Sequence, residues 1–158
     1  PTAAPSATPT QTPPSTAAPT AAPTVVPTRT LAPVWGSGWY PSPLLVSPQP
    51  RETFAAGEPV ILSWEPAGEL RAGVFYVITL AYRYGGRTVY DDVPWLTETS
   101  WDVTEHEYLR DLAERGQFYW SLTLMRQTGF DAEGKPVGTA ISPMSEVRMF
   151  TWEPASGG

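Results

Sequence analysis

From residue 43 onward, apolar and polar positions follow the two-residue alternation that is typical of β-strands with one buried face. The clearest cases are residues 60–64, where Val60, Leu62 and Trp64 alternate with Ile61 and Ser63, and residues 75–84, a β-branched and aromatic run without a breaker. Further strands are predicted at residues 100–103, 118–126 and 146–152. Six or seven short strands at this spacing predict an all-β sandwich.

Two turns with glycine connect parts of this pattern. Gly85-Gly86 separates residues 75–84 from residues 87–90 and predicts a two-residue hairpin, because such a turn needs positive φ at both positions. Glu133-Gly134 predicts a smaller hairpin between the strands at 118–126 and 146–152.

One segment departs from the strand pattern. Thr104 and Glu107 have the spacing of a capping box, and an apolar stripe follows at Tyr108, Leu109 and Leu112 before Gly116. These signals predict one helix of about ten residues from Glu105. We expect it to close one end of the sandwich or to cross between its sheets.

Residues 1–34 differ completely in composition: they hold nine Pro, nine Thr, eight Ala, two Ser and a single charge, Arg29. Such a tract cannot bury enough apolar surface to fold alone. We therefore expect it to extend away from the folded domain, to act as a spacer or to display the domain. Evenly spaced Pro-Thr pairs favour the extended polyproline conformation. The predicted organisation is an extended arm (1–34), an aromatic Gly/Ser junction (35–42), a sandwich (43–153) and a flexible tail (154–158).

The arm gains apolar residues toward the junction, and we expect these residues to contact a partner. The expected contact residues are Val25, Val26, Leu31, Val34, Trp35, Trp39 and Tyr40. Three roles stay open for the last three: stacking on sugar rings, anchoring the arm to a neighbouring subunit, or folding back as a lid over their own domain.

Thr-rich and Pro-rich tracts with few charges are typical of O-glycosylated stalks outside the cell. The candidate glycosylation positions are Thr10, Thr20, Thr24 and Thr28, and an unmodified linker is the alternative. The apolar runs are far too short for a membrane span. We expect a bacterial protein at the cell surface or in the extracellular space.

Three segments of the chain, in order, match the strands of a known kind of domain. They are residues 45–48 with Gly57 and residues 60–66, then residues 118–124, then residues 142–150. Their order and spacing resemble bacterial fibronectin type III-like and related immunoglobulin-like domains. The resemblance implies a β-sandwich over residues 43–153 with Trp64, Trp120, Leu122 and Leu124 in its core. Phe118 stands where these domains usually carry a corner tyrosine.

Charge and cysteine content exclude several classes of protein. From Trp35 onward, nine Lys and Arg against sixteen Asp and Glu give a formal charge of −7, which argues against nucleic acid and anionic membranes as partners. The chain has no Cys, so neither disulfides nor a thiolate zinc site can hold the fold. Stability must come from packing, which the Trp, Tyr and Phe residues supply.

Candidate catalytic or metal-binding residues are few. His106 is the only histidine, so a Ser-His-Asp triad would need it, but we expect a solvated surface residue. Six carboxylates within seventeen residues are candidates for calcium, although their spacing fits no loop motif: Asp91, Asp92, Glu98, Asp102, Glu105 and Glu107. Residues 131–134 are interpreted as a turn, and no pair of carboxylates is specified for glycoside hydrolysis. We therefore predict no enzyme activity, cofactor or metal.

Two hypotheses follow. The first is a non-enzymatic extracellular structural or adhesive subunit that self-assembles into a surface filament, with residues 25–40 donated to an adjacent copy. The second is a monomeric cell-surface ectodomain on a glycosylated stalk, which binds a polysaccharide or a partner protein. The mass of the intact chain in solution separates them.

Overall fold

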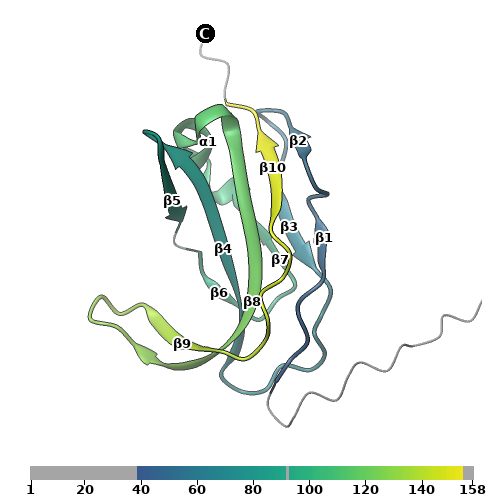
Figure 1. Ribbon diagram of the computed structural model, residues 1–158, viewed down its shortest axis with the longest axis vertical. Helices are drawn as coiled ribbons and strands as arrows, with labels where there is room; N and C mark the ends of the chain where they lie inside the picture. Colours follow the sequence, from purple (N-terminus) through teal and green to yellow (C-terminus); the bar gives the residue numbers. More distant parts are fainter. Residues whose placement is uncertain (1–38, 92, 155–158) are drawn as a thin grey trace, which may run out of the picture. The chain divides into compact units, whose positions relative to one another are not determined.

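The computed structural model describes residues 39–91 and 93–154, which form ten strands in this part of the chain (Figure 1). The strands are β1 (Leu45–Ser47), β2 (Glu52–Phe54), β3 (Ile61–Trp64), β4 (Val74–Tyr84), β5 (Arg87–Asp91), β6 (Trp95–Leu96), β7 (Ser100–Asp102), β8 (Gln117–Phe130), β9 (Pro136–Ala140) and β10 (Arg148–Trp152). The predicted arm, half of the junction and most of the tail lie outside the described residues.

The strands form two sheets that face each other. One sheet has the order β1-β3-β7, and the other has the order β2-β10-β8-β4-β5, with β6 on β4 and β9 on β8. Neighbours are antiparallel except β2 and β10, which run parallel. This is the strand order of a fibronectin type III-like sandwich, so the predicted fold class is confirmed.

The core lies between the sheets and is rich in aromatic rings. Trp64 lies 5.4 Å from Tyr76 and 6.5 Å from Trp120, measured between ring centroids. Phe118 stacks on Phe150 at 5.2 Å. The residues that the resemblance placed in the core, Trp64, Trp120, Leu122 and Leu124, are all buried. At the corner position, Phe118 contributes ring packing in place of a hydroxyl group.

The connection from β7 to β8 differs from the single helix that was predicted. It consists of a 3₁₀ turn (Val103–His106), a short α1 (Tyr108–Leu112) and a second 3₁₀ turn (Glu114–Gly116). The predicted capping box does not form. Asp102 accepts the hydrogen bond from the Thr104 N–H, at 2.8 Å, while the Thr104 hydroxyl accepts one from Val60 N–H. The segment does cross from one sheet to the other, as expected.

Both predicted turns form hairpins, but the second joins β8 to β9, a strand that the sequence pattern did not predict. Gly85 and Gly86 have φ of 57° and 74° and join β4 to β5. In the β8–β9 hairpin, the Asp131 carboxylate accepts hydrogen bonds from the N–H groups of Glu133 and Lys135. This second hairpin is longer than predicted and swings away from the two sheets (Figure 1).

Tyr82, a buried residue of β4, makes the free energy of unfolding depend on pH in the alkaline range. Burial raises the pKa of the Tyr82 phenol above its usual value of 10.0, and the nearby Asp91 and Tyr84 add to the effect. Above pH 10.0 the unfolded chain loses this proton before the folded protein does. The stabilisation is therefore complete below that pH and is lost as the pH rises through the folded-state pKa.

We expect Tyr82→Phe to reduce the fall of the unfolding free energy with pH in this range. One ionisation contributes at most about 1.4 kcal/mol per pH unit. Urea unfolding of both proteins from about pH 9 to about pH 11 measures the slope. Tyr90→Phe, which removes an exposed hydroxyl group, is the matched control. An identical slope in wild type and Tyr82→Phe would contradict the prediction.

Candidate binding surface

The outer face of the larger sheet carries almost no charge along its two central strands. Its outward residues alternate with the core residues of the same strands. In the central part of the two strands they are Phe75, Val77, Thr79 and Ala81 on β4, and Tyr119, Ser121, Thr123 and Met125 on β8; the charged Arg83 follows near the end of β4. An antiparallel sheet that faces water usually has polar outward residues. The lack of charge on these eight side chains therefore indicates a contact surface.

A groove crosses this face between two tyrosines. Tyr90 on β5 pairs with Ala81 on β4, and Ala81 pairs with Tyr119 on β8. Two strand spacings of about 5 Å each separate the tyrosines, and the small Ala81 leaves the space between them open. Thr79 and Ser121 are also cross-strand partners and extend the floor.

We call this feature the tyrosine groove. Its cavity measures about 370 Å³, and it is lined by Thr79, Ala81, Thr88, Tyr90, Tyr119, Trp120, Ser121, Met144 and Val147. None of these described lining residues is charged. Tyr90 is 69% exposed, and Tyr119, Met144 and Val147 are also exposed. The groove therefore presents aromatic and aliphatic side chains to any neighbour.

Two buried serines fix the wall that contains Met144. Leu124 N–H donates to Ser142 Oγ and Leu122 N–H donates to Ser145 Oγ, both at 2.9 Å. Pro143 lies between the serines and has no N–H for a strand ladder. The serine hydroxyl groups therefore take the place of backbone acceptors beside β8. They hold the segment before β10 against the sheet, with Met144 at the groove.

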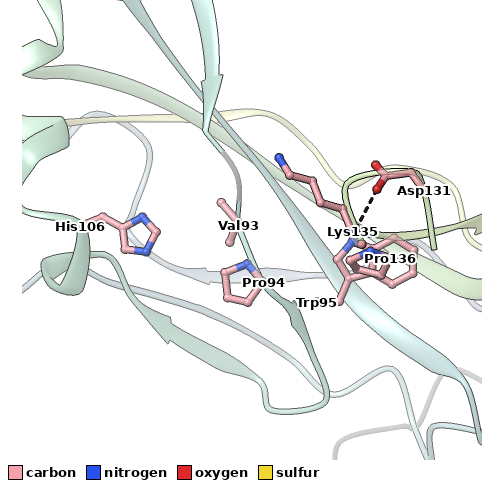
Figure 2. A pocket seen from close by; sticks show the side chains of 8 residues that line it. Val93, Pro94, Trp95, His106, Asp131, Lys135 and Pro136 are labelled. Carbon is pink, nitrogen blue, oxygen red and sulfur yellow. Dashed lines mark hydrogen bonds between the residues drawn. The ribbon is translucent and has the colours of Figure 1, made fainter.

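A second hollow, of about 570 Å³, lies between the segment before β6 and the β8–β9 hairpin. Figure 2 shows His106 on one side of it and Asp131 with Lys135 on the other, with Val93 and Pro94 between them. The dashed line marks the bond from the Lys135 backbone N–H to Asp131. Asp131 thus serves the hairpin turn, as predicted for residues 131–134.

The prediction of a solvated surface histidine is wrong. The His106 side chain is only 25% exposed, and its Nδ1 lies 3.0 Å from Asp91 Oδ2. Its ring packs edge-on against Trp101 and stacks with Tyr108. The 3₁₀ turn causes this burial by bringing the ring beside β5. An Asp-His pair is one part of a triad, but no Ser or Thr is among the described residues that line the hollow.

Three of the acidic residues of segment 91–107 serve separate local structures. Asp91 pairs with His106, Asp102 caps the first 3₁₀ turn, and Glu98 accepts from Thr97 N–H. Asp92 lies outside the described residues. Within the described part of the chain, no three acidic or histidine side chains lie close enough to hold a metal ion. The same residues contain no helix that is long and apolar enough to cross a membrane.

The predicted contact residues divide into two groups. Trp39 is 59% exposed and stays a candidate. Tyr40 is only 8% exposed, and its hydroxyl bonds to Glu69 O and Arg71 N–H. The structure corrects the expectation that Tyr40 contacts a partner and agrees with the third open role, because the Tyr40 side chain packs on its own domain. The remaining candidates lie outside the described residues: Val25, Val26, Leu31, Val34 and Trp35 for contact, and Thr10, Thr20, Thr24 and Thr28 for glycosylation.

Sequence reasoning missed the tyrosine groove. One signal was present, because the outward positions 75, 77, 79 and 81 are apolar or small and only Arg83 near the end of the run is charged, whereas strands with one solvated face usually carry polar outward residues. The pairing of Tyr90 and Tyr119 with Ala81 depends on strand register, which the sequence pattern alone does not specify.

Comparison with known proteins gives little beyond the fold. No family model matches the chain, and no curated protein matches it. Among solved structures, the chain is similar to the fibronectin type-III domain of human fibronectin type III domain containing protein 3. The identity is 19% and the TM-score 0.43, with 78% of this chain and 95% of that domain covered. The strand order described above establishes the fold independently of this similarity.

Proposed function

We propose that this protein is a non-catalytic extracellular binding subunit that self-associates through its Pro/Thr-rich arm. The tyrosine groove is the observation that carries the proposal. Exposed Tyr90, Tyr119 and Met144 are residue types that are enriched at protein interfaces. A groove lined by them supports binding rather than catalysis.

The distribution of charge favours an uncharged binding partner for the groove. The folded part of the chain is acidic, yet the described lining of the groove has no charged side chain. The arm has one charge, Arg29, in its thirty-four residues. Burying charged groups without partners is costly, so a nearly uncharged segment is a suitable occupant of an uncharged groove. Head-to-tail exchange of such segments builds a filament.

The proposal is tested on the full chain with the apolar residues of the arm removed. We expect replacement of Val25, Val26, Leu31 and Val34 by Ser to weaken self-association about tenfold or more, because interface contacts of this size are worth over 1 kcal/mol. Sedimentation equilibrium measures the association constant. The control is Val137→Ser, which alters an exposed valine on β9. A monomeric wild-type chain at all concentrations would refute the proposal.

Deletion of the arm provides a second test and should end at residue 38. A longer deletion would remove Tyr40, whose N–H donates to Ile141 O and whose ring lies in the core. Circular dichroism then shows whether the shortened protein keeps its fold. Unchanged assembly of a folded, shortened protein would contradict a role for the arm.

The alternative function is a monomeric ectodomain on a glycosylated stalk that binds a polysaccharide. The hydroxyl groups of Thr79, Thr88 and Ser121 lie among the tyrosines of the groove, and sugars bind to aromatic rings flanked by hydroxyl groups. This reading predicts a monomeric mass. It also predicts glycans at Thr10, Thr20, Thr24 and Thr28, which mass spectrometry of the native arm detects.

A further inference from the structure

We infer that the tyrosine groove binds residues 22–34 of the arm of a second copy in the polyproline conformation. This inference rests on the proposed self-association and names its two surfaces.

Aromatic grooves are the usual receptors for polyproline segments, whose rigid backbone binds at low entropic cost. The tyrosine groove has this form, with Tyr90 and Tyr119 on either side of the small Ala81. The two tyrosines lie about 10 Å apart across the strands, which leaves room for one extended chain. Their rings offer flat faces on which Pro and Val side chains can pack.

The arm sequence matches such a receptor. A polyproline helix has about three residues per turn, so every third side chain lies on one face. In residues 22–34 one such set is Ala22, Val25, Thr28, Leu31 and Val34. The single charge, Arg29, falls on a different face together with Val26. The segment would therefore present an uncharged, mainly apolar stripe to the uncharged groove.

The exposed edge of a sheet is a poorer site for the same segment. Binding at an edge requires backbone N–H groups for the strand ladder, and Pro has none. Pro23, Pro27 and Pro33 all fall within residues 22–34. A strand would also place Val25, Pro27, Arg29 and Leu31 on one face, which would bring the charge into contact.

The start of the described chain favours a second copy over the same copy. Tyr40 N–H donates to Ile141 O, and Ser42 Oγ donates to the carbonyl oxygen of Met144, which lines the groove. Only residues 35–39 separate the binding segment from this attachment. From Ser42 back to Tyr40 the described chain runs from Met144 to Ile141, whose N–H donates to Leu124 O, and so away from the groove. To enter its own groove, the chain would have to turn back within residues 35–39. Entry into the groove of another copy requires no reversal.

Substitutions in the full-length chain test both surfaces. We expect Tyr90→Thr with Tyr119→Thr to weaken self-association about tenfold or more, and Val25→Ser with Leu31→Ser to do the same. Tyr84→Thr is the matched control for the groove, because Tyr84 is exposed but does not line it. Thr30→Ser is the control for the arm, because it removes a methyl group at a position that lies off the apolar stripe. Each control should leave the association constant within about twofold of wild type.

Cross-linking locates the contact, because the chain has no cysteine of its own. One full-length variant carries Ala32→Cys in the arm, and a second, of different mass, carries Thr88→Cys in the groove. Mixed under mild oxidation, they should form a disulfide between the two variants. Ser100→Cys, an exposed position on β7 in the other sheet, is the control and should cross-link far less.

The outcomes separate the inference from the proposed function. Self-association that survives both the groove and the stripe substitutions would overturn the inference and leave the proposed function standing. Preferential cross-linking at Ser100→Cys would do the same. An intramolecular disulfide in a monomeric chain that carries both Ala32→Cys and Thr88→Cys would also overturn it, by showing the arm in its own groove. A wild-type chain that never associates would overturn both.

Discussion

Gly116→Ala is expected to lower the unfolding free energy by at least about 3 kcal/mol, a large part of the roughly 5 to 15 kcal/mol typical of a single domain. Gly116 ends the connection into β8 with a φ of 61°. An added Cβ would overlap the backbone carbonyl oxygen of Trp152 at the end of β10. The left-handed backbone alone costs an alanine about 1 to 2 kcal/mol, and the overlap must also displace one of the two strands.

Gly134→Ala separates these two effects. Gly134 has a φ of 78°, but a Cβ there meets no atom within 4 Å. This variant should lose only the backbone component, about 1 to 2 kcal/mol. Urea unfolding followed by tryptophan fluorescence measures both variants. Equal losses would show that the approach of Gly116 to Trp152 contributes nothing.

The sandwich was predictable because its strands are encoded by local alternation. The continuous run at residues 75–84 and the Gly85-Gly86 turn were sufficient to predict β4, β5 and their pairing. Each of these signals depends on neighbouring residues in the chain. Burial of one face of each strand then fixes the sheet arrangement.

The β7–β8 connection was not predictable in the same way. Thr104 and Glu107 have capping-box spacing, but Val60, which directly precedes the neighbouring strand β3, donates its N–H to the Thr104 hydroxyl. Ala113 then adopts an extended conformation, which ends α1. A contact between residues far apart in the sequence therefore replaced a local capping interaction.

The candidate binding surface was not predictable either, because it too depends on contacts between residues far apart in the sequence. Tyr90, Ala81 and Tyr119 come from three strands and form a groove only in the observed register. For Tyr40, an aromatic residue in a Gly/Ser junction, the sequence left open both contact with a partner and folding back over its own domain, and we expected a partner contact. Its hydroxyl instead satisfies backbone groups of residues 69 and 71 in the folded domain, a partnership that no local pattern reveals.

Arg148→Met is expected to cost about 3 kcal/mol, because hydrogen bonds to charged groups contribute about 1.5 to 3 kcal/mol each. The Arg148 side chain is only 12% exposed. Its guanidinium donates to the carbonyl oxygens of Leu45, Val46 and Pro48, at 2.8 Å, 3.2 Å and 3.0 Å. These carbonyls lie where the chain leaves β1 in one sheet for β2 in the other. Methionine keeps the apolar stem and leaves all three acceptors without this donor.

Two further variants make the Arg148 prediction specific. Arg148→Lys should recover only part of the loss, because one ammonium group cannot reproduce the planar fork that reaches three carbonyls. Arg83→Met is the matched control: its exposed guanidinium lies 3.9 Å from Glu114, and such surface pairs are worth less than about 1 kcal/mol. Urea unfolding ranks the three variants. If Arg148→Met costs no more than Arg83→Met, this arginine does not hold the crossing between the sheets, and β1 and β2 are kept in place by their strand pairing alone.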